Sequence, residues 1–228
     1  MEKQNHITRR RFIQTAGKAA TVLASAAGAS LILPASVRGA TAPSNRITVA
    51  CIGTGNQGFN ILQQFLKNDD AQIVAVCDVN RASYGYKDDS QFLGREPAQK
   101  AVNAHYAEKT TSGRYKGCDI YTDFREVLAR KDIDAVTIVV PDQWHALMTV
   151  AACKAGKDIY CEKPLSLTIR QGQEMTKAVR QYKRILQTGS HERSNPTTRR
   201  ACELVRNGRI GQLKKISNYS ALGSSRGW

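Results

Sequence analysis

Two short segments of this 228-residue sequence combine residue types that could do chemistry, and the first is a glycine-rich loop, Gly53-Thr54-Gly55-Asn56-Gln57-Gly58. It follows an apolar, strand-like run and precedes residues with helical spacing. In such a loop the first glycine permits a tight turn, the second lets the backbone approach a pyrophosphate, and the third lets helix and strand pack closely. The loop predicts a dinucleotide site at residues 53–58. The alternative is a set of turn and packing glycines that binds nothing.

Asp78 supports the dinucleotide hypothesis, because it ends the next strand-like run at residues 73–77. A carboxylate at this place can accept hydrogen bonds from the adenosine ribose, and it would repel the 2′-phosphate of NADP. This favours NAD as the cofactor. Arg81 follows three residues later and could relieve the repulsion, so NADP stays open. The alternative for Asp78 is a cap of a turn or helix.

The second segment is Glu162-Lys163-Pro164. Taken alone, a Glu-Lys pair at the end of a strand is a solvated ion pair of little energetic value. Next to a bound cofactor, however, the lysine could hydrogen-bond a substrate hydroxyl or polarise a developing carbonyl oxygen. The hydride chemistry itself would belong to the nicotinamide. Lys163 is therefore the candidate catalytic residue.

The elements that must position these residues alternate along the chain from Arg46 onwards. Strands are expected at residues 47–52, 73–77, 135–140, 158–161 and 185–188. Helices are expected around 61–66, at 97–109, 123–129, 145–155 and 168–182, and from Asn195-Pro196 to Gly208. This alternation predicts an α/β fold with a doubly wound parallel sheet of Rossmann type. Part of the polar stretch 83–117 is expected to be a surface excursion.

The same topology predicts where the chemistry should gather. Right-handed crossovers place the carboxyl ends of parallel strands along one edge of the sheet, where open α/β sheets bind ligands. Four residues each follow an expected strand directly and should meet at that edge: Gly53, Asp78, Pro141 and Glu162.

Charge and cysteine usage exclude some other classes. The formal net charge of +15 could attract nucleic acid, but the basic residues are scattered and no nucleic-acid-binding motif is present, so no such partner is expected. None of the six cysteines forms a C-x-x-C pair, which gives no support for a zinc or thiol-redox site. Cys51, Cys77 and Cys161 lie in strand-like runs and are interpreted as buried free thiols.

The first 42 residues are typical of an export signal. The basic stretch 1–18 contains Thr8-Arg9-Arg10-Arg11-Phe12-Ile13-Gln14, a twin arginine followed by apolar residues, and it precedes the uncharged stretch 19–37. This layout predicts a twin-arginine signal and a periplasmic or otherwise exported protein. The alternative is a membrane anchor, but Gly28 and Pro34 interrupt a stretch that is only weakly apolar. No stable membrane span is expected in the mature form.

Three longer runs carry a family resemblance: Val76-Cys77-Asp78-Val79-Asn80, Pro141-Asp142-Gln143-Trp144-His145 and Ala155-Gly156-Lys157-Asp158-Ile159-Tyr160-Cys161-Glu162-Lys163-Pro164-Leu165. With residues 186–194 and 207–211, they resemble the glucose–fructose oxidoreductase / inositol dehydrogenase (Gfo/Idh/MocA) family. The similarity extends from about Arg46 nearly to the C-terminus, and the run ending in Glu-Lys-Pro is its most specific part.

The resemblance implies roles for individual residues. Lys163 would be the catalytic lysine that contacts substrate. Glu162 and the segment from Pro141 to His145 would lie near the nicotinamide ribose, and Arg193 near the cofactor or the domain junction. For His145 the alternative is a satisfied imidazole at a helix N-terminus. A carbohydrate or polyol substrate and a homo-oligomer in the full-length protein are also implied.

Members of this family continue into a large open antiparallel sheet that supplies substrate specificity and a further catalytic histidine or aspartate. The expected organisation is therefore a signal at 1–42, an NAD(P)-binding Rossmann domain at 43–190, and the start of an α+β open-sheet substrate domain at 191–228. In the last part, 213–220 would be the first strand of a truncated sheet. His191 comes too early to replace the missing histidine.

The leading functional hypothesis is an NAD(P)-dependent oxidoreductase that transfers a hydride between nicotinamide and a sugar or polyol carbinol. A second hypothesis is a glycoside hydrolase of the same fold that oxidises and re-reduces its sugar with NAD. The third is a non-catalytic module or fragment that only binds a dinucleotide. Product analysis would separate the first two, and binding without turnover would support the third.

Overall fold

The computed structural model of the chain describes residues 45–85 and 90–217. Within them, six parallel strands form one sheet in the order β3-β2-β1-β4-β5-β6, which confirms the doubly wound sheet. The order reverses between β1 and β4, which is where such sheets open a crevice for ligands. The strands are β1 (Ile47–Ile52), β2 (Ala71–Cys77), β3 (Asp119–Tyr121), β4 (Ala135–Ile138), β5 (Asp158–Glu162) and β6 (Leu186–Gly189).

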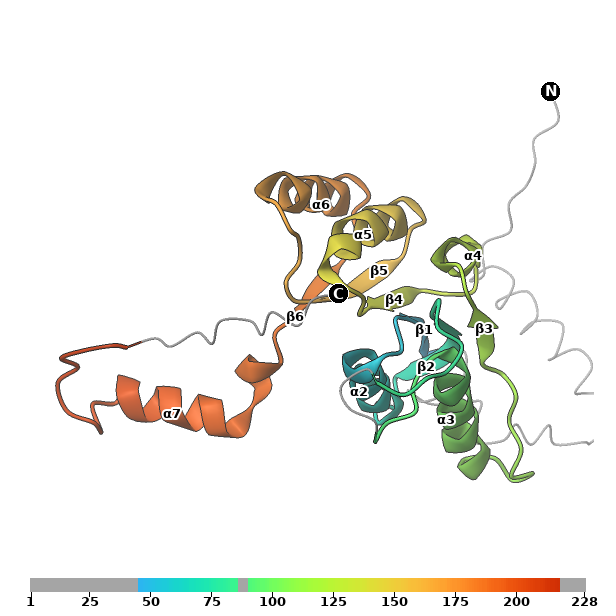
Figure 1. Ribbon diagram of the computed structural model, residues 1–228, viewed down its shortest axis with the longest axis horizontal. Helices are drawn as coiled ribbons and strands as arrows, with labels where there is room; N and C mark the ends of the chain where they lie inside the picture. Colours follow the sequence, from blue (N-terminus) through green and yellow to red (C-terminus); the bar gives the residue numbers. More distant parts are fainter. Residues whose placement is uncertain (1–44, 86–89, 218–228) are drawn as a thin grey trace, which may run out of the picture. The chain divides into compact units, whose positions relative to one another are not determined.

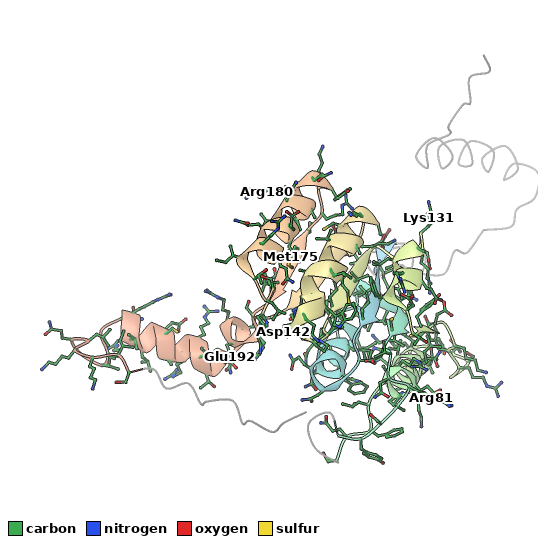
Figure 2. The ribbon with its side chains drawn as sticks, turned by 45° about the horizontal axis from the view of Figure 1, so that its top comes forward. Arg81, Lys131, Asp142, Met175, Arg180 and Glu192 are labelled. Atoms are coloured by element: carbon green, nitrogen blue, oxygen red, sulfur yellow. The ribbon has the colours of Figure 1, made fainter. Side chains whose placement is uncertain are left out.

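Helices cover both faces of the sheet (Figure 1). On one face, α2 and α3 bury residues such as Leu62 and Val102 against Val76. On the other, α4, α5 and α6 pack over β1, β4 and β5, and the side chain of Met175 lies on the inner side of α6 (Figure 2). The helices are α2 (Asn56–Leu66), α3 (Arg95–Glu108), α4 (Phe124–Ala129), α5 (His145–Lys154), α6 (Ile169–Gln181) and α7 (Pro196–Arg206), with 3-10 turns η3 (Asp142–Trp144) and η4 (His191–Ser194).

The strand register brings the carboxyl ends level. Ile52 of β1 lies beside both Cys77 of β2 and Ile138 of β4, and Ile138 lies beside Cys161 of β5. We call the residues that follow these pairs the carboxyl edge. It begins at Gly53, Asp78, Val139 and Glu162.

Several boundaries differ from the predictions. The strand expected to reach residue 140 ends at Ile138, so Pro141 does not follow it directly. Helix α3 begins at Arg95, because Pro97 then occupies the first turn, where its missing N–H breaks no helical bond. Strand β3 was not predicted, since three residues are too few to show a period. Of the expected strand 213–220, residues 213–217 form no strand and 218–220 lie outside the described residues.

Two further predictions concern the cysteines and the N-terminus. Five thiols are buried, as expected for those in strands, and the sixth, Cys202 on α7, is exposed. No helix in residues 45–85 or 90–217 is long and apolar enough to cross a membrane. The export signal predicted at 1–42 lies outside the described residues.

Candidate functional site

The glycine loop at residues 53–58 has the geometry that its composition predicts. Gly53 adopts a positive φ of 85°, and a Cβ at this position would overlap the carbonyl group of Val139. A Cβ at Gly58 would overlap the carbonyl group of Gly53. The first glycine is therefore required by the turn, and the third by the close approach between helix α2 and the loop.

The N-terminus of α2 is prepared for an anion. Among the described residues no side chain caps it, and its first turn contains no acidic residue. Helix α5 shares both features, whereas Asp123, Thr168 and Asn195 cap α4, α6 and α7. The first N–H groups of a helix have no partner within the helix, and its N-terminus carries a partial charge of about +0.5. Together with the glycine cradle, this end fits a pyrophosphate group.

Asp78 joins the end of β2 to the glycine loop. Its Oδ2 accepts hydrogen bonds from the backbone N–H of Thr54 at 2.7 Å and from the Thr54 hydroxyl at 3.1 Å, and its Oδ1 accepts one from Asn80 N–H at 2.9 Å. A carboxylate offers about four acceptor positions, so about one remains for a ribose hydroxyl. Asp78 is therefore both a cap of the loop and a candidate ligand of the cofactor.

Two cations near the end of β2 are already engaged. Arg81, labelled in Figure 2, places its Nε 2.6 Å from a carboxylate oxygen of Glu96. Arg95 donates to the backbone carbonyl groups of Asp78 and Val79. Neither arginine lines the pocket beside Asp78. This arrangement leaves the negative charge of Asp78 facing the pocket and favours a ribose without a 2′-phosphate.

The Glu-Lys-Pro segment places a buried carboxylate beside an exposed ammonium group. Glu162 is 3 % exposed and accepts hydrogen bonds from the Tyr160 hydroxyl at 3.0 Å and from Lys163 N–H at 3.1 Å. Burial, and then the bond to Glu162, raise the pKa of Tyr160 to about 12, so it stays a donor at neutral pH. The Lys163 side chain is exposed, its ammonium group has no partner in the described part of the chain, and the Lys163–Pro164 peptide bond is cis.

These segments line one pocket of about 840 Å³, a size typical of sites for small molecules. The pocket brings together nine of the predicted site residues: Gly53, Gly55, Asn56, Gln57, Gly58, Asp78, Pro141, Glu162 and Lys163. The glycine loop, the uncapped N-terminus of α2 and the Asp78 carboxylate thus share a cavity with the candidate catalytic lysine.

Three predicted residues do not line this pocket. Thr54 is fully buried and turns its hydroxyl towards Asp78, so it shapes the loop. His145 is also buried, with Nδ1 2.6 Å from the carbonyl oxygen of Pro164. Arg193 lies in the turn η4 and lines a different pocket, together with residues of α7.

The pocket also contains residues that sequence reasoning missed. The segment 122–125, at the start of α4, forms part of the wall because it follows β3, the strand that was too short to predict. Met148 lines it as well. Trp144 also lines the pocket and is 45 % exposed, but it belongs to the segment 141–145 that the family resemblance had already placed near the nicotinamide ribose. Cys77 is also in the wall, but burial raises the pKa of its thiol to about 12, which excludes a thiolate nucleophile at neutral pH.

Comparison with known proteins agrees with this geometry. Residues 47–190 match the Gfo/Idh/MocA family, described as an oxidoreductase family with an NAD-binding Rossmann fold. An alpha-N-acetylgalactosaminidase from Shewanella oneidensis is 31 % identical over 179 residues, which cover 73 % of this chain and 36 % of that protein. A glycosyl hydrolase family 109 protein from Shewanella sp. strain MR-4 is 31 % identical over 178 residues, with the same coverage.

Solved structures show the same fold. The crystal structure of myo-inositol 2-dehydrogenase from Lactobacillus plantarum superposes with a TM-score of 0.57 at 27 % identity, covering 73 % of this chain and 43 % of that one. Scyllo-inositol dehydrogenase from Lactobacillus casei, crystallised with NAD(H) and scyllo-inositol, has a TM-score of 0.56 at 24 % identity over 73 % of this chain and 42 % of that one. The chain spans less than half the length of each of these proteins. It belongs to the Gfo/Idh/MocA oxidoreductase family and has that family's NAD-binding Rossmann fold.

Proposed function

We propose that this chain forms the cofactor half of an NAD-dependent oxidoreductase that acts on the CH–OH group of a sugar or polyol. The observation that carries the proposal is the pocket that Lys163 lines together with the glycine loop and Asp78, with an ammonium group that has no partner among the described residues. The inositol dehydrogenases with this fold make a polyol or sugar the first substrate class to test.

Different groups of this chain would bind the cofactor and the substrate. The N-terminus of α2 would hold the pyrophosphate, and Asp78 would accept a hydrogen bond from the adenosine ribose. When bound, the nicotinamide would accept or supply the hydride. Lys163 would hold the reacting oxygen of the substrate and stabilise its negative charge, while the buried Glu162 fixes the Lys163 backbone through its N–H.

Turnover assays on the full-length protein test this proposal. The protein is mixed with NAD and a panel of inositols, hexoses and sugar acids, and the nicotinamide absorbance is followed. At least one polyol or sugar should produce NADH at a rate that depends on protein concentration. Tight NAD binding without turnover on any member of the panel would contradict the proposal and favour a non-catalytic dinucleotide-binding protein.

A second candidate function follows from the relatives. Because proteins named glycosyl hydrolase family 109 and alpha-N-acetylgalactosaminidase are 31 % identical to this chain, a glycoside hydrolase that uses NAD transiently is also proposed for test. A chromogenic N-acetylgalactosaminide would then release its leaving group without net formation of NADH. An oxidoreductase would instead accumulate NADH and release no sugar.

We also propose that NAD is preferred to NADP, that the full-length protein is a homo-oligomer, and that the protein is exported by the twin-arginine route. The cofactor preference is supported by Asp78 and the Arg81–Glu96 pair. Export is supported by the composition of residues 1–42 alone. Replacing Arg9, Arg10 and Arg11 by lysine should keep the protein in the cytoplasm, and unchanged export would contradict this route.

A further inference from the structure

His145 is the first residue of α5 and is only 1 % exposed. Its neighbour Trp144 lines the pocket, but the imidazole ring turns inward, and its Nδ1 lies 2.6 Å from the Pro164 carbonyl oxygen. A carbonyl group can only accept a hydrogen bond, so Nδ1 carries the proton in this contact. The bond therefore joins the start of α5 to the turn that contains Lys163.

The hydrogen bond between His145 and Pro164 is one of two that hold the backbone at Lys163. On one side, the backbone N–H of Lys163 donates to a carboxylate oxygen of Glu162 at 3.1 Å. On the other side, the carbonyl group of Pro164 accepts the bond from His145. Both anchoring side chains are buried, whereas Lys163 itself is exposed to the pocket. The backbone is thus hydrogen-bonded at the N–H of Lys163 and at the carbonyl group of the next residue, Pro164.

The second nitrogen of the imidazole ring supports the importance of the hydrogen bond to Pro164. His145 Nε2 is buried and has no hydrogen-bond partner in the described part of the chain. A buried polar atom without a partner destabilises the folded state. The burial of this histidine is therefore not explained by a fully satisfied imidazole. The bond from Nδ1 to Pro164 is the polar contact that the ring makes.

We propose that His145 is a positioning residue that fixes the ammonium group of Lys163 relative to the bound cofactor, and is not itself a ligand of the cofactor. The inference rests on the proposed function of Lys163. A reacting group misplaced by about 1 Å can cost about 10²-fold in rate, so a clamp on both sides of the lysine backbone has a catalytic use.

Two amide variants of full-length protein test the proposal, because each copies one ring nitrogen. His145→Asn places its N–H near the position of Nδ1, whereas His145→Gln places it near Nε2 and loses the bond to Pro164. The readout is the modification of Lys163 by pyridoxal 5′-phosphate, reduced with borohydride and counted by peptide mass spectrometry, with and without NADH. His105→Gln is the matched control, because His105 Nε2 is also buried without a partner in the described residues but lies on α3.

NADH should protect Lys163 in the wild type, His145→Asn and His105→Gln. In His145→Gln the protection should fall by about tenfold while NADH still binds, since the lysine is displaced and the glycine loop is untouched. Equal protection in the two His145 variants would overturn the inference alone. Failure of NADH to bind the wild type would contradict the proposed function itself.

A measurement on the wild type keeps the proposal testable if His145→Gln does not fold. In nitrogen-resolved NMR, the His145 ring should carry a slowly exchanging proton on Nδ1, shifted downfield by its short hydrogen bond. A ring protonated only on Nε2 would remove the proposed bond and overturn the inference.

Discussion

Two lysines flank strand β5 and have opposite surroundings. Lys157 lies directly before the strand, is 5 % exposed, and donates to the backbone carbonyl groups of Arg130 and Ile133. Lys163 lies directly after the strand and is exposed, and its ammonium group has no partner in the described residues. One strand of five residues therefore separates an ammonium group used by the fold from one left available to a ligand.

The same contrast extends along both edges of the sheet. We call the edge at which the parallel strands begin the amino edge. There, Arg130 bridges Asp119 and Asp132, and the carboxylate of Asp134 accepts two hydrogen bonds from Thr48. At the carboxyl edge, the first turn of α2 has no side-chain cap among the described residues, and the pocket lies open. Polar groups that bond one another stabilise a fold, whereas groups without internal partners can bind something else.

The largest expected effect is at the carboxyl edge. Lys163→Met should lower turnover by about 10²- to 10⁴-fold, because the group that holds the reacting oxygen is lost. The free energy of unfolding and the affinity for NAD should change little, since the ammonium group has no partner among the residues that the structure describes. Steady-state kinetics measures the loss of turnover, and denaturant unfolding measures the free energy of unfolding. Turnover within threefold of the wild type would show that Lys163 is not catalytic.

The same substitution at the amino edge should have the opposite effect. Lys157→Met leaves the buried carbonyl group of Ile133 and the part-buried one of Arg130 without their donor, and it should lower the free energy of unfolding by about 2 to 4 kcal/mol. Burial lowers the pKa of Lys157, so the cost of dehydrating its charge offsets part of the two bonds. Urea unfolding measures the loss, and calorimetry should find NAD binding unchanged in the folded variant. A variant as stable as the wild type would refute the contrast between the two lysines.

A smaller effect is expected at the rim of the carboxyl edge. Glu96→Gln frees Arg81 near Asp78 and should strengthen NADPH binding by about three- to fivefold, which is the scale of an exposed ion pair. Affinity for NADH should stay the same. Glu108→Gln, also exposed on α3, is the matched control. Fluorescence titration measures both affinities, and equal NADPH affinity in the two variants would remove Arg81 and Glu96 from cofactor selection.

The sequence was a good guide wherever a long pattern carried the information. The glycine loop, Asp78 and Lys163 follow strands whose apolar runs are easy to recognise, so their meeting at one edge followed from topology. Strand β3 was missed because three residues show no periodicity, and with it the pocket segment 122–125 was missed.

His145 shows a second reason for a miss. Its place at the start of α5 was predicted, but the direction of its side chain depends on how the turn at Pro164 packs against the helix. Such a contact between residues 19 positions apart leaves no local pattern in the sequence. The sequence therefore predicted which residues gather at the carboxyl edge more reliably than which of them face the pocket.

The most direct test of the central claim is a calorimetric titration of the full-length protein with NAD. The carboxyl edge predicts one NAD bound per chain, and no measurable binding by Gly58→Ala, whose added Cβ overlaps the Gly53 carbonyl group. Circular dichroism would confirm that the variant is folded. A folded wild type that binds no NAD, or a Gly58→Ala variant that binds it equally well, would contradict the account.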